Sequence, residues 1–347
     1  MSIITDATLE KVRQQIVLRN NRLRDFAELY AQTTWDNVRL DVKTLSPEAL
    51  AAKYPIGTLM TCGYTLDGVA YDFPWVVMDN ARECEWEDGS VHPGLWLGAR
   101  YGTIEEIQFD APEQEEATEE TAQEGLYYCG RTGSTYTMLD LSAGDTIPHS
   151  DYDHVYHSAI NHKDIFSSGY NRWSHSGQRQ WLNSGADAGA WWESKHVGDC
   201  PPSQLSTRKG FMAGLDSDFL SVLHPVKVQT SCNTVTDGGV TDVTYDTFFL
   251  QSLEEVYGQP QAVGVEGEYF PYWKEILGID APSNDVNEAR KISRINTPTG
   301  SAVLLRLRSA SRGYSGYAWY IVGSVGNLNN YGNATSSYSA LPACVIS

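Results

Sequence analysis

Histidines and aspartates gather in the middle of the chain, where they could bind a metal ion. The cluster comprises His149, Asp151, Asp153, His154, His157 and His162. His154 and His157 are three residues apart, so on a helix both imidazoles would face the same ion. A polar loop that carries these histidines without a metal explains the same residues, and it is the interpretation we favour.

Three aspartates further along, Asp237, Asp242 and Asp246, could supply oxygen ligands to a calcium ion. The Gly238-Gly239 pair between them equally suits a plain hairpin turn. His175 has no nucleophile or acidic partner at a suggestive spacing. The chain contains no HExxH, Gly-x-Ser-x-Gly, phosphate-loop or dinucleotide-binding motif. We therefore expect no catalytic residue, no metal and no cofactor.

The C-terminal residues 309–339 indicate binding rather than catalysis. About two thirds of them are Ser, Tyr, Asn or Gly. Tyr offers a large, stiff contact area with a polar end, while Ser, Asn and Gly offer adaptable hydrogen bonding, as in an antibody-type paratope. Tyr314, Tyr317 and Tyr320 recur every third residue around Trp319. Because this spacing fixes no face in a loop, we expect Trp319 to fill core and most Tyr and Asn side chains to point outward.

Charge is distributed unevenly along the chain. The formal net charge is -19, but no Asp or Glu follows Glu288. The basic residues beyond it are Arg290, Lys291, Arg294, Arg306, Arg308 and Arg312. The C-terminal part is therefore a mildly basic face on an acidic body, and the overall charge argues against nucleic acid and anionic membranes as partners. Arg306 and Arg308 alternate with leucines, which predicts a strand with one apolar and one charged face.

The elements that would position these residues are short. Strands are predicted at 58–60, 75–78, 95–97, 226–230, 244–250, 302–307 and 340–346, and helices at 176–183 and 218–223. We interpret 46–55 as a connection and 110–124 as a solvated, mobile acidic insert that lacks the calcium-loop pattern. Short strands, few helices and long irregular connections predict an α+β domain dominated by loops.

A helix is predicted over residues 5–31. Apolar residues recur there at heptad positions, broken only by Arg19: Leu9, Val12, Ile16, Leu23, Phe26 and Tyr30. This helix either packs against its own domain or docks or oligomerises the protein. We accordingly divide the chain into an N-terminal helical docking or oligomerisation segment, 1–50, and a larger domain, 51–347.

Cysteine usage and hydropathy bound the cellular context. The six cysteines, which form no CxxC pair, are expected to be buried and reduced, with disulfides as the alternative. The N-terminus lacks the basic and apolar regions of a secretory signal. No stretch approaches the roughly eighteen consecutive apolar residues of a transmembrane helix. We expect synthesis in a cytoplasm and no membrane insertion.

The densest polar and aromatic cluster, 171–183, is expected to be structural, with Arg179 and Asn183 donating to loop carbonyls. Its pattern, Asn171-x-Trp173-x-x-Ser176-x-x-Arg179-x-Trp181-Leu182-Asn183, resembles the core of an uncharacterised domain family of gut bacteria and their phages. Shorter similarities lie at 210–215, 226–228, 248–250, 254–258 and 271–273, so the resemblance covers the chain from about residue 55 onward. The ending, from Arg308-Ser309-Ala310 to Ala343-Cys344-Val345-Ile346, is similar to variable proteins of diversity-generating retroelements.

That resemblance implies a C-type lectin fold whose C-terminal segment displays diversified residues, since adenine-directed mutagenesis of Asn codons yields Tyr, Ser, Asn, Gly and Thr. The positions it implies as displayed and variable are Ser311, Tyr314, Tyr317, Tyr320, Asn329, Asn330, Tyr331, Asn333, Ser336 and Tyr338. Ala318, Trp319, Leu328 and the closing strand would be fixed scaffold. Family members often carry Trp-Trp-Leu-Arg-Ser where this chain has Leu-Leu-Arg-Leu-Arg-Ser.

The leading hypothesis is a non-enzymatic ligand- or receptor-binding protein at the tail tip of a phage, and therefore in the virion. Its partner would be a protein or glycan receptor on a cell surface. It would form a homo-oligomer, with a trimer favoured, or dock on a phage tail protein. Two alternatives remain open. One is a fixed-specificity adhesin or lectin of a bacterial surface or cytoplasm, although the usual calcium-lectin triplets are absent and Gln259-Pro260-Gln261 is the nearest. The other is a formylglycine-generating-type enzyme, for which Cys344 lacks the necessary cysteine partner.

Overall fold

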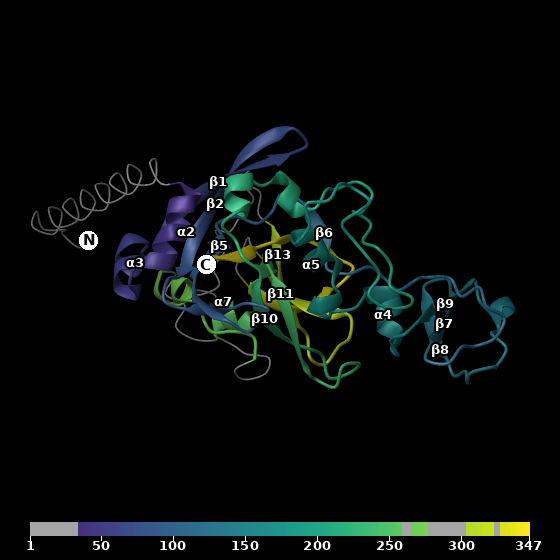
Figure 1. The fold of residues 1–347 in the computed structure, drawn as a ribbon. Coiled ribbons are helices and arrows are strands. Elements are labelled where there is room, and N and C mark those ends of the chain that lie inside the picture. Colours follow the sequence, from purple (N-terminus) through teal and green to yellow (C-terminus); the bar gives the residue numbers. More distant parts are fainter. Residues whose placement is uncertain (1–33, 259–264, 277–302, 323–326) are drawn as a thin grey trace, which may run out of the picture.

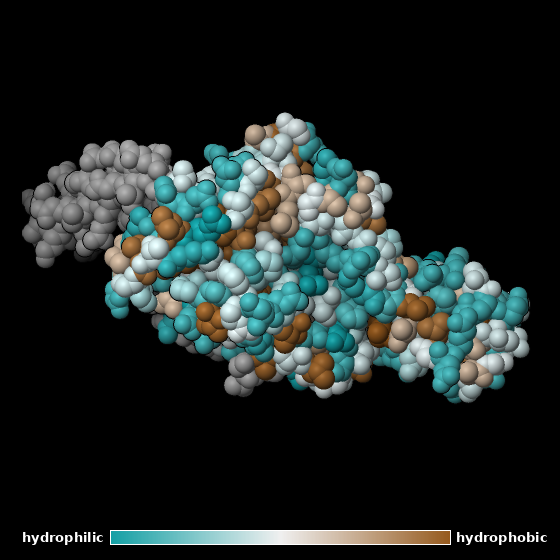
Figure 2. Space-filling model, in the orientation of Figure 1, coloured by the Kyte–Doolittle hydropathy of each residue, from teal (hydrophilic) through white to brown (hydrophobic). Residues whose placement is uncertain are grey.

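The computed structural model describes residues 34–258, 265–276, 303–322 and 327–347 (Figure 1). The helix expected over 5–31 lies outside these residues. The described chain is an α+β protein without a closed barrel in these ranges. None of its described helices is long and apolar enough to cross a membrane. The face seen in Figure 2 is largely hydrophilic, with hydrophobic residues in scattered small patches.

Two five-stranded sheets form the body. The first has the order β1 (Leu59–Leu66), β2 (Val69–Asp79), β5 (Leu95–Ala99), β17 (Pro342–Ile346) and β12 (Phe249–Leu250). The second has the order β15 (Asn327–Asn333), β14 (Tyr317–Val322), β13 (Leu304–Ala310), β16 (Ser337–Ala340) and β6 (Glu106–Gln108). β13 and β16 pair in parallel, whereas the other pairs in both sheets are antiparallel.

Smaller sheets and short helices cover this body. The small sheets are β3 (Glu83–Glu85) with β4 (Val91–Pro93), β10 (Val226–Ser231) with β11 (Thr241–Asp246), and β8 (Thr135–Leu139), β7 (Tyr127–Thr132), β9 (His154–Ser158). The α-helices are α2 (Trp35–Thr44), α3 (Pro47–Lys53), α4 (Lys163–Ser168), α5 (Gly177–Leu182), α6 (Ser217–Leu220) and α7 (Leu253–Tyr257). Single turns are η1 (His149–Asp151), η2 (Trp173–His175), η3 (Phe211–Gly214) and η4 (Tyr272–Ile276). In Figure 1 the β7–β9 sheet projects from the body beyond α4.

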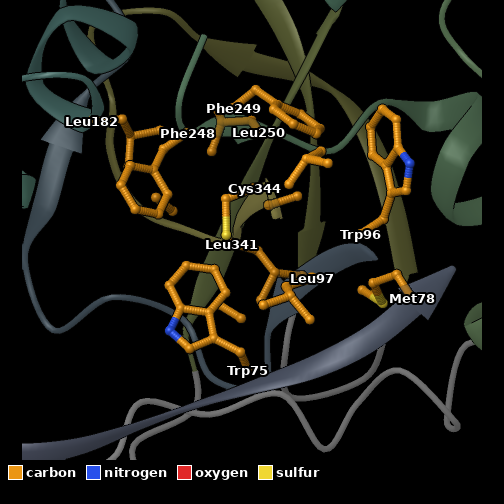
Figure 3. Close-up of a cluster of buried hydrophobic side chains, with 14 of the residues drawn as sticks. Trp75, Met78, Trp96, Leu97, Leu182, Phe248, Phe249, Leu250, Leu341 and Cys344 are labelled. Carbon is orange, nitrogen blue, oxygen red and sulfur yellow. The ribbon is translucent and has the colours of Figure 1, made fainter. Parts of the chain in front are cut away.

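The main core lies around the first sheet. The end of β2 and all of β17 are buried on both faces, which explains their continuous apolar sequences. Trp75 is fully buried and its ring lies 5.7 Å from that of Phe248 and 5.1 Å from that of Phe219. Figure 3 shows Trp75, Leu97 and Cys344 in one apolar cluster contributed by three neighbouring strands. The strand that ends the chain thus completes the core begun by β1, β2 and β5.

The helices α2 and α3 also belong to this core. Thr34 and Ser46 cap α2 and α3 through their side-chain oxygens, and Pro47 occupies the first turn of α3. Val38 of α2 and Leu50 of α3 are buried in the main cluster. The segment 46–55, which was interpreted as a connection, therefore contains a helix that packs on the main core, and this core has members on both sides of residue 50.

Most predicted strands are confirmed in place, but three segments differ. The run 340–346 is divided at Leu341, with Ala340 ending β16 of the second sheet and Pro342 beginning β17 of the first. The run 244–250 is divided into β11 and β12, because the backbone N–H groups of Thr247 and Phe248 donate to Asn183 Oδ1 and cannot continue a ladder. Residues 309–339, analysed above as a loop, instead contribute to strands β13 to β16. The helices predicted at 176–183 and 218–223 are present as α5 and as the shorter α6.

The acidic insert 110–124 was expected to be solvated and mobile. Glu115, Glu116 and Glu120 are exposed, but solvent does not surround the whole insert. Asp110, Glu113, Ala117 and Ala122 are buried. Glu113 accepts hydrogen bonds from Ser158 Oγ at 2.5 Å and contacts His196 Nε2 at 2.7 Å. The two alanines pack in a small core under the projecting sheet. Acidic composition alone does not reveal that such carboxylates have buried partners.

The two arginines of β13 were expected on a charged, solvated face, and both are instead buried, Arg306 at 0% and Arg308 at 1% exposure. Arg308 donates from Nη1 to Glu255 at 2.5 Å and from Nη2 to the same carboxylate at 3.0 Å. It also donates to the carbonyls of Leu250 and Glu266. Glu255 closes a capping box with Ser252 at the start of α7. The ion pair therefore joins β13, β12 and α7.

Removing one partner of this buried pair should destabilise the fold strongly. Arg308→Met leaves Glu255 charged and unpaired in the interior, so we expect the free energy of unfolding in urea to fall by about 3–5 kcal/mol. The matched control is Arg208→Met, because Arg208 pairs with the exposed Asp67. That change should cost less than about 1 kcal/mol. Equal losses for the two variants would contradict a structural role for the Arg308 pair.

Candidate binding surface

Three tyrosines of the C-terminal segment form an exposed aromatic cluster. Ring centroids lie 5.2 Å apart for Tyr314 and Tyr317, 5.7 Å for Tyr314 and Tyr331, and 6.0 Å for Tyr317 and Tyr331. Tyr314 is 40% exposed and Tyr331 60% exposed, while Tyr317 is half-buried. Coulomb interaction with Tyr331 raises the pKa of Tyr314. Rings at these separations hold one another in place and still offer apolar area and hydroxyl groups to a partner.

The cluster is assembled by pairing within the second sheet. Tyr317 begins β14 and Tyr331 lies in β15, with Tyr317 opposite Asn333 and a register shift between Ala318 and Tyr320. Tyr314 belongs to the turn between β13 and β14, where its backbone N–H donates to the Ser311 carbonyl. Side chains from a turn and two strands therefore meet at one end of the sheet.

A second aromatic pair lies over Arg306. The rings of Tyr320 and Tyr338 are 4.9 Å apart, and the Arg306 guanidinium carbon lies 4.2 Å from the centre of the Tyr338 ring. Both tyrosines are half-buried, and burial raises the pKa of Tyr320. Burial lowers the pKa of Arg306 to about 10, which leaves the guanidinium charged at neutral pH. The cation and the two rings form a packed layer beneath the sheet surface.

Arg306 holds the backbone of the displayed strands. Its Nη1 donates to the carbonyls of Ala318 and Gly332 at 3.3 and 3.0 Å. Its Nη2 donates to those of Asn333 and Ser336 at 2.7 and 3.2 Å. One buried side chain thus binds carbonyls of β14, β15 and the turn before β16. Every residue type has a backbone carbonyl, so these bonds do not depend on which side chains the strands carry.

Asn171 holds the backbone of the turn that carries Tyr314 by donating to its carbonyls. Its Nδ2 lies 2.6 Å from the carbonyls of Tyr314 and Tyr317 and 3.3 Å from that of Ser311. Its backbone N–H donates to the Ser315 carbonyl at 2.9 Å. Asn171 is itself oriented by Asn233, whose Nδ2 donates to Asn171 Oδ1 at 2.9 Å. The conformation of the turn is therefore set by residues that lie outside it.

The loop between β10 and β11 fixes the same segment from another side. The Thr234 backbone N–H and hydroxyl both donate to the Arg312 carbonyl, at 2.8 and 2.9 Å. Asn233 Oδ1 accepts the backbone N–H groups of Val235 and Thr236 and so shapes the loop. The sequence pattern singled out Asn171, but nothing in it indicated Asn233 or Thr234, because these contacts span more than sixty residues.

The three aspartates considered as calcium ligands form ion pairs with arginines instead. Arg172 donates to Asp242 from Nε at 2.7 Å and from Nη2 at 2.6 Å, and it lies 3.3 Å from Asp237. These hydrogen bonds to Asp242 raise the pKa of Arg172. Asp246 accepts from Arg179 Nε at 2.7 Å and from Trp173 Nε1 at 3.0 Å. The carboxylates are therefore neutralised by the protein, and Arg179 and Trp173 have the structural role expected of them.

The histidine cluster is spread over several elements: His149 lies in η1, His154 and His157 lie in β9, and His162 caps α4. His154 and His157 belong to β9, where a spacing of three places them on opposite faces. His154 Nδ1 contacts Glu116 at 2.5 Å, and His157 Nδ1 contacts Glu119 at 2.9 Å. The shared-metal interpretation was wrong for this reason, and the described residues contain no group of three or more His, Cys, Asp or Glu side chains suited to a metal. His175 is half-buried, and the partial burial of its imidazole lowers its pKa to about 4.

The ten positions expected to be displayed divide into groups. Ser311 is 3% exposed and its N–H donates to the Tyr317 carbonyl, so its expected display was wrong. Those that are half-buried are Tyr317, Tyr320, Asn329, Asn333, Ser336 and Tyr338. Asn330 lies in β15, and the exposure of its side chain lies outside the description. Tyr314 and Tyr331 are the most exposed of the set.

Comparison with protein families places this arrangement in a known group. The model of a domain of unknown function (DUF6273) matches residues 154–347. The chain belongs to this family. No curated protein and no solved structure matches the chain. The family span contains Asn171, Arg306 and all the tyrosines above, but β16 and β17 pair with β6 and β5, which lie before it. Both large sheets of this DUF6273 protein therefore need strands from outside the family span.

Stability should depend on the supporting side chains and not on the displayed ones. Asn171→Ala removes the side-chain donor of the Tyr314 carbonyl and leaves the Tyr317 carbonyl with the Ser311 N–H alone. We therefore expect a loss of about 2–3 kcal/mol in the free energy of unfolding. Tyr314→Ser removes an exposed ring and should leave that free energy unchanged within error. Urea unfolding followed by tryptophan fluorescence measures both. If Tyr314→Ser destabilised the protein as much as Asn171→Ala, the distinction between support and display would fail.

Proposed function

We propose that this protein is a non-enzymatic ligand- or receptor-binding protein whose C-terminal sheet presents a variable binding surface. The observation that carries the proposal is the support of that surface through main-chain carbonyls. The side chains of Arg306 and Asn171 together bind the carbonyls of seven residues from Ser311 to Ser336. Replacing a displayed side chain removes none of these bonds, so the surface can change its specificity and keep its fold.

Composition and exposure fit this role. Exposed tyrosines provide affinity through rigid, amphipathic contact area, and the surrounding Ser, Asn and Gly adapt to the partner. A cluster of three rings gives a small anchor, so we expect modest affinity for each copy and a gain through oligomers that present several copies. The similarity to variable proteins of diversity-generating retroelements supports adenine-directed change at these positions.

We further propose that the body has the C-type lectin fold of those proteins. Two features support this. The chain's closing strand, β17, pairs between β5 and β12, and a second sheet built mostly from the C-terminal segment carries the tyrosines. Long irregular connections join the elements. An experimental structure superposed on a retroelement variable protein tests this part of the proposal.

The biological setting we propose is a phage tail tip, with a protein or glycan receptor on the surface of the host cell as partner. A fixed-specificity adhesin with the same fold is the alternative outcome of the test below. An enzyme of the formylglycine-generating type is disfavoured, because Cys344 is fully buried and burial raises the pKa of its thiol well above the usual value.

Sequencing the 3′ end of the gene across a natural population tests variability directly. We expect substitutions at the codons of displayed positions, foremost Tyr314 and Tyr331, arising at adenines of a nearby template copy. The codons of Arg306, Asn171 and the buried Ser311 should stay constant because these residues hold the backbone. An invariant 309–339 segment would favour the fixed adhesin. Variation at Ser311 equal to that at Tyr331 would contradict the structural division.

The role of the N-terminal segment is tested by the molar mass of the protein in solution. We propose that residues 1–33 oligomerise the protein, with a trimer favoured, or dock it on a tail protein. Light scattering after size exclusion should give an oligomeric mass for the full chain and a monomeric mass for a chain starting at Thr34, which keeps the cap of α2. Identical masses, with the far-ultraviolet spectrum retained, would contradict oligomerisation by this segment.

A further inference from the structure

A polar pocket lies apart from the tyrosine surface. It is formed by α5, the 190–195 segment and the end of β11, and its volume is about 380 Å³. The residues of its lining that matter here are Arg179, Trp191, Trp192, Glu193, Lys195 and Tyr245. Pockets that bind small molecules start at about 300 Å³, so the space suits a ligand of a few to about a dozen heavy atoms. No residue of 309–339 lines it.

The charged groups around this pocket cancel in pairs. Arg179 Nε lies 2.7 Å from Asp246 Oδ1, and Lys195 Nζ forms an ion pair with Glu193. An anionic ligand would have to compete with a carboxylate already bound to each cation. A cationic ligand would meet the same obstacle at each carboxylate. The pocket therefore favours an uncharged occupant.

Several polar groups in the lining retain unused hydrogen-bonding capacity. Trp192 Nε1 is buried and has no acceptor in the described part of the chain. Arg179 donates from Nε to Asp246 and from Nη1 to the Ser174 carbonyl, and its Nη2 has no acceptor among the described residues. Tyr245 is half-buried, and its hydroxyl makes no hydrogen bond within those residues. A buried indole N–H without an acceptor costs about 1–3 kcal/mol, which a bound hydroxyl or ether oxygen would offset.

The same lining supplies aromatic area. Trp191 is buried with its Nε1 donating to the Arg208 carbonyl at 2.7 Å, so its ring is held rigidly. Trp192 and Tyr245 are partly exposed and line the pocket beside it. The partly exposed rings of Trp192 and Tyr245, backed by the buried Trp191 and next to donors without acceptors, match a molecule that has C–H groups on one side and oxygens at its rim.

We propose that this pocket binds an uncharged polyhydroxylated ring, that is, a neutral monosaccharide or the terminal unit of a glycan. The hydroxyl and ring oxygens accept from Trp192 Nε1 and Arg179 Nη2, one hydroxyl exchanges a hydrogen bond with Tyr245, and the C–H face lies against the aromatic rings. This site is independent of the tyrosine surface and goes beyond the proposed function.

The test uses the full chain and the methyl glycosides of glucose, galactose, mannose and N-acetylglucosamine as probes. Binding is followed by tryptophan fluorescence and by saturation-transfer NMR. We expect at least one glycoside to bind saturably with a dissociation constant on the order of 1 mM. Trp192→Phe keeps the ring and removes the N–H, and Tyr245→Phe removes only the hydroxyl. Each should weaken binding roughly ten-fold, which corresponds to one hydrogen bond.

Controls separate this site from the tyrosine surface. Tyr314→Ser and Tyr331→Ser should leave glycoside binding unchanged, whatever they do to receptor binding. The proposal is overturned if no neutral glycoside gives a saturable signal, if glucuronate or inorganic phosphate binds in preference, or if Trp192→Phe and Tyr245→Phe bind as the natural protein does. Retained circular dichroism spectra establish that the two variants are folded.

Discussion

The rest of the structure depends on one constraint, which is that pairing within the segment 309–339 does not supply every donor that its carbonyl groups need, so side chains from outside it complete the set. A buried carbonyl without a donor costs about as much as a lost hydrogen bond. If displayed side chains supplied those donors, every change of specificity would also be a loss of stability. Arg306 and Asn171 supply them instead, and both are completely buried. Display and support are thereby assigned to different residues.

The supporting residues need partners of their own, and this links the surface to the rest of the chain. Asn171 is oriented by Asn233, and Asn233 also shapes the loop that binds the Arg312 carbonyl. Arg306 lies in β13, the central strand of the second sheet, and it stacks on Tyr338 from β16. β16 is paired at its other edge by β6, which precedes the family span. The surface therefore rests on contacts from residue 106 to residue 339.

Strands with continuous apolar runs, such as β2 and β17, could be predicted from sequence because burial on both faces leaves a local signature. The helix α5 was predictable from its cap at Ser176. The burial of Arg306 was not, because alternation with leucine is the pattern of a half-exposed strand. Only carbonyls up to thirty residues away make that burial possible. The partners of the acidic insert were missed for the same reason, since Glu113 and His196 are 83 residues apart.

The division between support and display also explains why composition overstates the number of free positions. Ser311 has the residue type of a displayed position, yet its carbonyl accepts from Asn171 and its N–H binds the Tyr317 carbonyl, so the site is enclosed. A larger side chain there would displace the backbone that positions Tyr314 and Tyr317. Tyr338 is restrained differently, because its ring covers Arg306 and a small residue would open that cation to water. In the function we propose, the freedom to vary is therefore set by what each position holds in place, and we expect it to be greatest at Tyr314 and Tyr331, whose side chains are the most exposed.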